Sequence, residues 1–431
     1  FFFFFFDLIS NPTHAQQKMA TAACTLAWDY LTRSSTRVTS PFEAEEMKSY
    51  PVYFVPSKRF LYYGPYNNAF DDHDSRYDAQ IGDHIQYRYE IEAKIGSGAF
   101  GDCWRCYDHK TRTRVALKMI RNERRFLMQG RIEVQMLENV RKSGTKSCVQ
   151  MINNFLFRSH LCITFGVLAH DLYAEIKARE FAGFSVAETR VIVKDILECL
   201  VSLKEEEIVH ADLKPENILF NTSDDLSKVT VIDLGSSCYN HNRIHTYIQS
   251  RYYRAPEIVL GCGYGCAVDM WSLGCVVGEL LTARPMFPAK CEQDLLLYQQ
   301  ELLGLIPTRM LNHSNRKHDF FHESELKNID GSARWYPISM CDVKDRKRVP
   351  GSVTLTTVLA ATTNSDELED FLKRCLTFDP TTRMTPAQAL LHPFITATTT
   401  TPTTITTPTP TTTQKVPAST TTPHTNISKN T

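Results

Sequence analysis

The chain has 431 residues, and its 48 Lys plus Arg balance 48 Asp plus Glu, so the formal net charge is zero. That balance speaks against nucleic acid or a polyanionic surface as the main partner. No stretch approaches the roughly 20 consecutive apolar residues of a membrane-spanning helix, and the odd number of 13 cysteines suits a reducing compartment better than a disulfide framework.

In chain order, residues 1–40 form a poorly defined N-terminus. The phenylalanine run at its start has no basic region and meets Asp7 directly, so we expect a truncated start rather than a secretory signal peptide. Residues 41–86 contain short pieces that we expect to pack, together with an acidic, turn-like stretch at 70–74. From residue 396 onward the tail is mostly Thr and Pro, so we expect 396–431 to be disordered.

Residues 87–395 show denser and more regular patterning. Their apolar runs predict five strands, at 89–95, 102–107, 114–120, 149–157 and 161–167. One helix interrupts the strands, because apolar residues recur every four positions at Met128, Ile132, Met136 and Val140. Helical patterns dominate after residue 170, and 271–281 is apolar on most sides. We predict an α+β fold with two lobes, a small antiparallel β-sheet lobe with one helix at 87–168 and a larger helical lobe at 169–395.

A glycine-rich loop follows the first predicted strand. Gly96, Gly98 and Gly101 have the spacing G-x-G-x-x-G, which also occurs in dinucleotide-binding folds and in plain tight turns. Here a second strand follows instead of a helix, so the motif belongs to a hairpin. Because glycine lets the backbone approach closely, such a hairpin can lay N–H groups over phosphates. A purely structural turn is the alternative.

The third predicted strand carries Lys118 among apolar residues, where an ammonium group is costly unless it is paired. The following helix offers Glu133 as a partner, fifteen positions later (133 − 118). An ion pair between the two would hold the ammonium where it can meet the α- and β-phosphates of ATP. The alternative is a surface lysine at a strand edge.

Two polar stretches further along the chain suit phosphoryl transfer. Asp212 can accept the proton of an attacking hydroxyl, Lys214 can steady the transferred group, and Asn217 can ligate Mg²⁺. Asp233 follows a short apolar run and is placed for the main metal contact. Either aspartate alone could cap a helix. The ordered combination of these residues indicates transfer of a phosphoryl group from ATP, with Mg²⁺ as the cofactor.

Over residues 88–395 the chain resembles the eukaryotic protein kinase family, whose motif order it follows. The resemblance includes Ala255-Pro256-Glu257, the stretch 269–274 and Arg383, and it implies that Glu257 pairs with Arg383. It implies catalytic roles for Asp212, Lys214, Lys118 and Glu133, and metal ligation by Asn217 and Asp233. It also implies the nucleotide-binding residues Ile95, Gly96, Gly98, Phe100, Gly101, Cys103, Ala116, Lys118, Phe165, Gly166, Val167 and Leu168.

Finer features resemble the dual-specificity tyrosine-regulated kinases. These are the stretch 247–254 before Ala-Pro-Glu, Gly235-Ser236-Ser237-Cys238, the stretch 87–90, the acidic stretch 71–74 and, as in class II members, the accessory segment at 42–54. The resemblance implies autophosphorylation of Tyr247 and then phosphorylation of Ser or Thr that precedes proline and follows an upstream arginine. Arg251 and Arg254 suit a phosphotyrosine. Glu216 suits a substrate arginine, and a structural salt bridge is equally compatible with it.

Departures from the family pattern occur at Ala211, Leu234 and Gly166, and none removes a catalytic group. They leave a pseudokinase scaffold, which binds partners without turnover, as the alternative function. Phosphorylation of small molecules is disfavoured by the peptide platform that the Ala-Pro-Glu segment implies. We expect a monomer in the cytoplasm that binds protein substrates and neither nucleic acid nor membranes. The basic stretch 344–348 fits a solvated loop better than a nuclear import patch, which would add the nucleus as a compartment.

Overall fold

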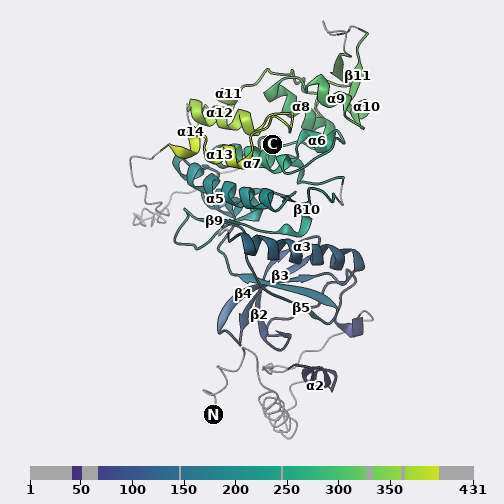
Figure 1. Cartoon of the computed structure of the whole chain (residues 1–431), viewed down its shortest axis with the longest axis vertical. Helices are drawn as coiled ribbons and strands as arrows, with labels where there is room; N and C mark the ends of the chain where they lie inside the picture. The colour runs from purple at the N-terminus through teal and green to yellow at the C-terminus, as the bar shows by residue number, and fades with distance from the viewer. Residues whose placement is uncertain are drawn as a thin grey trace, which may run out of the picture.

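The computed structural model describes residues 41–50, 67–144, 147–243, 246–325, 327, 333–360 and 365–397. The predicted N-terminus at 1–40, positions 51–66 of the accessory segment and positions 398–431 of the predicted tail at 396–431 lie outside these ranges. Thr396, the first residue of the predicted disordered tail, is instead the last residue of a short helix. Two lobes follow one another along the long axis of the molecule, a sheet lobe in purple and blue and a helical lobe in green and yellow (Figure 1). The predicted α+β architecture is confirmed.

The sheet lobe is built on six antiparallel strands in the order β1-β2-β3-β4-β6-β5. All five predicted strands are present. The additional strand, β1, has only two residues, too few to show a periodic pattern, and it pairs with the start of β2. The bounds are β1 (His84–Ile85), β2 (Tyr89–Ser97), β3 (Gly101–Asp108), β4 (Thr113–Ile120), β5 (Met151–Phe157) and β6 (His160–Gly166).

The predicted helix is α3 (Arg124–Ser143), which ends at Gly144 in a left-handed conformation (φ 74°). Met136 and Val140 are fully buried, but Met128 is 57% exposed, so the predicted apolar stripe is buried only in its C-terminal part. At the N-terminal end the helix instead directs Gln129 and Glu133 inward. Two polar side chains therefore occupy the buried face at the N-terminal end of α3.

The helical lobe is organised around α7 (Ala267–Thr282), which is buried almost all round, as its apolar sequence predicts. Next to it lies α5 (Val186–Glu205), which begins with a capping box between Ser185 and Glu188. The other helices are α4 (Leu172–Ala178), α6 (Pro256–Val259), α8 (Glu292–Leu303), α9 (Thr308–Asn312), α10 (Lys317–Phe320), α11 (Leu355–Leu359), α12 (Asp366–Cys375), α13 (Pro386–Leu390) and α14 (Pro393–Thr396).

Among the described residues, three two-stranded sheets complete this lobe. They pair β7 (Ile208–Val209) with β10 (Cys238–Tyr239), β8 (Ile218–Phe220) with β9 (Val229–Val231), and β11 (Phe321–Glu323) with β12 (Trp335–Pro337). The first two sheets enclose the loops that carry Asp212 and Asp233. These polar residues are therefore held between short apolar strands.

A buried ion pair joins distant parts of the helical lobe. Arg383 donates two hydrogen bonds to the carboxylate of Glu257, at 2.6 and 2.9 Å, and both side chains are fully buried. Arg383 also donates to the backbone carbonyls of Thr377, Ala267 and Phe378. The guanidinium group is thus surrounded by acceptors, and the pairing expected from the family resemblance is present.

The N-terminal helix α2 (Pro41–Met47) belongs to the core of the sheet lobe. Arg158, in the turn between β5 and β6, is buried and pairs with Glu43 at 3.4 Å and Glu46 at 3.0 Å. Its guanidinium carbon lies 3.9 Å from the centre of the Phe70 ring. An internal arginine therefore connects the accessory segment to the sheet.

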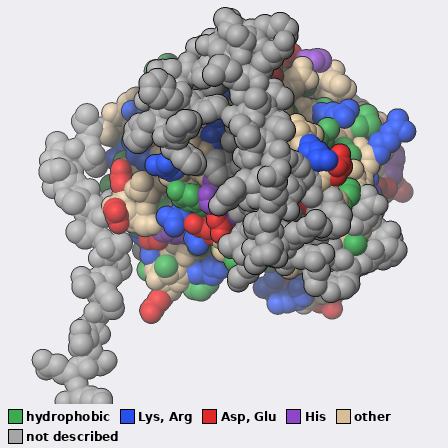
Figure 2. Space-filling view, turned by 90° about the horizontal axis from the view of Figure 1, so that it is seen from below, with side chains coloured by type: hydrophobic (Ala, Val, Ile, Leu, Met, Phe, Trp, Pro, Cys, Tyr) green, Lys and Arg blue, Asp and Glu red, His purple; other side chains and the backbone are tan. Residues whose placement is uncertain are grey.

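On the face seen from the sheet-lobe end, both basic and acidic groups lie among the visible side chains (Figure 2), as expected from the balanced composition. In the basic stretch 344–348, Arg346 and Arg348 both pair with Asp342, at 2.8 and 2.9 Å, and Arg348 is buried. These contacts favour the loop interpretation of that stretch. Among the described residues, no helix has the length and apolar character to cross a bilayer.

Candidate active site

Lys118 connects the two lobes. Its ammonium nitrogen lies 2.7 and 3.0 Å from the carboxylate oxygens of Glu133 on α3, and 2.7 Å from Oδ1 of Asp233 in the helical lobe. The predicted pairing with Glu133 is therefore present, and the carboxylate predicted to bind metal is brought to the same point. Gly235 makes room for this arrangement, because an added Cβ there would lie 2.9 Å from Asp233 Oδ1 and 3.0 Å from Lys118 Nζ.

The charges in this cluster control its ionisation. Desolvation favours the neutral acid, but the nearby Lys118 ammonium outweighs it and lowers the pKa of Asp233 to about 2. Burial works against the Lys118 cation, and the two carboxylates reverse that effect and raise its pKa above the usual value. At neutral pH the site therefore presents an ionised carboxylate with hard oxygen atoms, which are the ligands that Mg²⁺ prefers.

A second cluster surrounds Asp212, which lies in the loop after β7. Lys214 Nζ donates to its Oδ2 at 2.6 Å, and Asn217 Nδ2 donates to its backbone carbonyl at 2.8 Å. Since the Asn217 nitrogen is used in this way, its amide oxygen is the atom suited to a cation. The three residues predicted from the sequence stretch 210–217 are thus brought together. Glu216 in the same stretch is exposed.

Two further residues that hold this loop were not predicted. Ser250 donates through its hydroxyl to Asp212 Oδ1 at 2.7 Å and also contacts Lys214 Nζ at 3.3 Å. Asp269, buried at the start of α7, accepts from the backbone N–H groups of His210 and Ala211 at 2.8 and 3.0 Å. In the sequence Asp269 stands at the head of an otherwise apolar helix and opens the stretch 269–274 of the kinase resemblance, but no local pattern assigns it to this loop.

The departure at Ala211 coincides with an unusual backbone conformation. Ala211 has a φ of 67°, in the left-handed region that L-residues rarely adopt, and it is fully buried. Asp233 has a φ of 65°, so both loops that carry the predicted catalytic and metal-binding carboxylates contain a strained residue. The contacts from Asp269 hold the first of them in place.

The predicted adenine-side residues share one face of the sheet. Cys103 is paired directly opposite Lys118, and Ala116, two residues before Lys118, is opposite Phe165. All four are half-buried, whereas their neighbours Trp104 and Leu117 point to the buried face. Of the residues that flank this face, Leu168 is half-buried, and the exposed ones are Ile95, Gly96, Gly98, Gly166 and Val167.

The glycine-rich loop passes very close to β4. A Cβ at Gly101 would lie 2.0 Å from the carbonyl oxygen of Met119, so only glycine fits there. Phe100, at the tip of the loop, contacts Phe126 edge to face and lies close to Gly235, so the loop is folded towards the Lys118 cluster. The tip of the predicted phosphate-binding hairpin thus lies beside Gly235, which itself adjoins the Lys118 ammonium and the Asp233 carboxylate.

Replacing Gly101 by alanine is expected to displace the loop and destabilise the sheet lobe by about 1–3 kcal/mol, because the clash is with backbone. Urea denaturation followed by fluorescence measures the change in the free energy of unfolding. Gly263→Ala is the matched control, since an added Cβ there meets no atom closer than 3.5 Å. Equal stability of the two variants would contradict the expectation.

The predicted regulatory residues are only partly brought together. Arg254 is buried, donates to the Tyr247 hydroxyl at 2.5 Å, and lies 3.9 Å from the centre of the Tyr247 ring. Arg251 instead donates to the backbone carbonyl of Lys290 at 2.6 Å. The prediction that both arginines flank Tyr247 is therefore met by Arg254 alone in this conformation. Tyr247 itself is 55% exposed.

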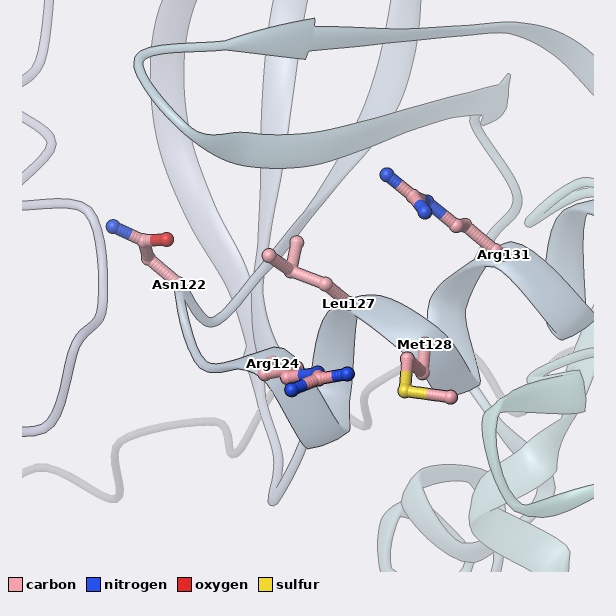
Figure 3. A pocket seen from close by; sticks show the side chains of 5 residues that line it. All are labelled: Asn122, Arg124, Leu127, Met128 and Arg131. Atoms are coloured by element: carbon pink, nitrogen blue, oxygen red, sulfur yellow. The ribbon is translucent and has the colours of Figure 1, made fainter.

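A hollow of about 540 Å³ lies beside the first turns of α3, lined by Asn122, Arg124, Leu127, Met128 and Arg131 (Figure 3). None of these residues belongs to the predicted nucleotide-binding or catalytic sets. The exposed Met128 lines this hollow, which is why it departs from the predicted buried stripe.

Comparison with known proteins agrees with this geometry. Residues 89–395 match the protein kinase domain family. The chain is 42% identical over 375 residues to dual specificity tyrosine-phosphorylation-regulated kinase 3 of Mus musculus, which covers 84% of this chain and 64% of that protein. It is 43% identical over 330 residues to dual specificity tyrosine-phosphorylation-regulated kinase 4 of Homo sapiens, and the match covers 76% of this chain and 61% of that protein.

A third relative, dual specificity tyrosine-phosphorylation-regulated kinase mbk-2 of Caenorhabditis elegans, is 41% identical over 375 residues, covering 82% of this chain and 45% of that protein. The chain thus spans less than two thirds of the length of these relatives. The motif order, the contacts of Lys118 and Asp212 and these similarities agree. The chain belongs to the protein kinase family and, within it, to the dual-specificity tyrosine-phosphorylation-regulated kinases.

Proposed function

We propose that the chain transfers the γ-phosphoryl group of ATP to serine and threonine hydroxyls of protein substrates, after autophosphorylation of Tyr247. The observation that carries this proposal is a pair of clusters in neighbouring loops, one joining Lys118, Glu133 and Asp233, the other joining Asp212, Lys214 and Asn217. The Ile232 backbone N–H, next to Asp233, donates to the Asn217 carbonyl at 2.9 Å and so connects the two loops. Every group that phosphoryl transfer needs is present with a partner that positions it.

In the proposed reaction the substrate hydroxyl oxygen forms a bond to the γ-phosphorus, and the bond from that phosphorus to the bridging β–γ oxygen breaks, releasing ADP. Asp212 accepts the hydroxyl proton, and Ser250 fixes its Oδ1. Lys214 lies beside Oδ2, where it can stabilise charge on the transferred group. Lys118 would bind the α- and β-phosphates.

Asp233 and Asn217 fit Mg²⁺, because one supplies an ionised carboxylate of low pKa and the other an amide oxygen. Held by these two residues, the ion would neutralise negative charge on the phosphates. Glu133, which accepts two hydrogen bonds from Lys118, would keep the ammonium in place beside them.

Arg254 supports the proposed role of Tyr247. Its buried guanidinium already donates to the Tyr247 hydroxyl, and a phosphate there would offer it several stronger acceptors. Arg254 also donates to the backbone carbonyls of Ile248 and Gln249. Phosphorylation of Tyr247 would therefore strengthen the anchoring of the segment that leads to Ser250.

The test is incubation of the purified chain with Mg-ATP and a degenerate peptide library, with mass spectrometry of peptides and enzyme. We expect phosphate on Ser and Thr followed by Pro, a preference for upstream Arg, and phosphotyrosine at Tyr247. Asp233→Asn is the inactive control. A chain that binds ATP but yields neither product would instead be a scaffold that binds partners without turnover.

Two carboxylates support the proposed preference for arginine. Glu216 is exposed beside the catalytic loop, and Glu279 lies buried near it. Burial raises the pKa of Glu279 to about 7; the hydrogen bond from the Tyr253 hydroxyl at 2.7 Å opposes the shift, and the charge of Glu216 adds to it. The negative charge around Glu216 therefore depends on pH in the neutral range.

Since Glu279 is neutral below about pH 7 and ionised above it, affinity for a substrate arginine should rise with pH. Between pH 6 and pH 8 we expect KM for an arginine-containing peptide to fall about threefold relative to the same peptide with alanine in place of arginine. Steady-state kinetics of the two peptides measure the ratio of their KM values at each pH. In Glu279→Gln the ratio should not change with pH, and a persistent change there would assign the effect to another group.

A further inference from the structure

Arg76, outside the matched kinase domain, contacts the glycine-rich loop. One guanidinium nitrogen donates to Asp102 Oδ1 at 2.8 Å, and the other donates to the backbone carbonyl of Gly98 at 2.8 Å. The Asp102 side chain is 8% exposed and the Arg76 side chain 19% exposed, so the pair is largely shielded from water. One side chain therefore holds both the interior of the loop and the strand that follows it.

Asp102 is the centre of a larger network. Ser97 donates through its hydroxyl to Oδ1 of Asp102 at 2.7 Å, and Lys94 approaches Oδ2 at 3.0 Å. Ser97 ends β2, and Asp102 is paired directly with it on β3. The carboxylate thus joins both strands of the hairpin at the base of the loop, while Arg76 reaches beyond that base to Gly98.

The segment that carries Arg76 is itself anchored. The Arg76 backbone N–H donates to the Asp72 side chain at 2.9 Å, and the Asn122 backbone N–H, just before α3, donates to Ser75 O at 2.8 Å. Arg121 donates to Asp74 O at 2.7 Å. Arg76 is therefore presented from a turn fixed to the junction between β4 and α3.

Holding the Gly98 carbonyl also determines the direction of the next N–H group. In a planar trans peptide the carbonyl of Gly98 and the N–H of Ala99 point in opposite directions. With the carbonyl bound to Arg76, the Ala99 N–H is directed away from the guanidinium group.

We propose that Arg76 is a positioning residue that preorganises the glycine-rich loop for the phosphates of ATP. This inference rests on the proposed function, because it takes ATP as the ligand of the loop. Without Arg76 the loop would have to be ordered at the time of binding, which weakens affinity without altering the chemical groups at Asp212. The effect should therefore appear in nucleotide binding rather than in turnover.

The experiment compares Arg76→Ala with the unsubstituted chain and with a control variant, Arg141→Ala. Arg141 is an exposed arginine near the end of α3. For Arg76→Ala we expect KM for ATP and Kd for Mg-ADP to rise about fivefold, as suits the loss of a charge-assisted contact. We expect kcat and KM for peptide to change less than about twofold. Amide hydrogen exchange across 96–101 should accelerate.

A second variant separates loop positioning from folding. Arg76→Lys keeps the charge near Asp102 but lacks the planar fork that reaches Gly98 at the same time, so an intermediate Kd is expected. Thermal denaturation identifies any variant that fails to fold, and Arg76→Lys then carries the test. Unchanged Mg-ADP binding and unchanged exchange in 96–101 would overturn the inference.

The outcomes also separate this inference from the proposed function. A wild-type chain that binds Mg-ADP without phosphorylating peptide would refute the proposed activity, while the Kd comparison would still decide the role of Arg76. An active wild type whose Arg76→Ala variant has unchanged KM for ATP would refute the positioning role and leave the proposed function in place.

Discussion

Replacing Asp212 by asparagine is expected to lower kcat by about 10² to 10⁴-fold, because the variant loses the proposed acceptor of the hydroxyl proton. The amide still accepts from Ser250 on one side, but its nitrogen faces Lys214, which donates to Asp212 Oδ2 at 2.6 Å in the native protein. Steady-state phosphorylation of a serine peptide measures the loss.

Binding of Mg-ADP should change little in this variant, since Asp212 is neither among the residues expected to contact the nucleotide nor one of the two expected to hold Mg²⁺, Asn217 and Asp233. Asp224→Asn, at an exposed position between β8 and β9, is the control for the chemical change itself. If Asp212→Asn retained more than about a tenth of native kcat, proton acceptance by this carboxylate would not be part of the rate-limiting chemistry.

Arg383→Ala should lower the free energy of unfolding by about 3–5 kcal/mol, because removing one partner leaves Glu257 as an unpaired charge in the interior. Three backbone carbonyls also lose their donor. Urea denaturation followed by circular dichroism measures the change, and reduced activity at physiological temperature should accompany it.

Arg374→Ala provides the matched control within the same part of the chain. Arg374 pairs with Asp370 at 2.8 Å, but the two side chains are 59% and 49% exposed. Removing such an exposed pair costs only about 0.3–0.5 kcal/mol. Similar losses in the two variants would show that the Arg383–Glu257 pair contributes no more than a surface contact.

Local patterns in the sequence predict much of this molecule. Alternating residues identify the strands, and Lys118 and Glu133 are close enough in the chain for a strand and the following helix to bring them together. The order of motifs then predicts the approach of Asp212, Lys214 and Asn217, which lie within one loop. Each of these predictions depends on short-range geometry, such as the strand period and the reach of a turn.

The contacts that could not be predicted join residues far apart in the chain. Ser250 is 38 residues from Asp212, and Asp269 is 59 residues from His210. Nothing in either local pattern shows that these groups meet, because the packing of the helical lobe decides it. The same applies to Met128, whose helical spacing predicts burial, whereas within the described part of the chain its side chain is exposed.

The burial of Arg158 has a consequence for how the protein can be shortened. The domain match begins at residue 89, yet Arg158 needs Glu43 and Glu46 from α2 to balance a charge that water cannot reach. A fragment cut at the edge of the matched domain would carry a destabilising arginine and an uncovered Phe157, because the Tyr77 and Tyr87 rings that contact Phe157 would be removed. We therefore expect the smallest independently folding unit to include α2, which supplies both acidic partners of Arg158.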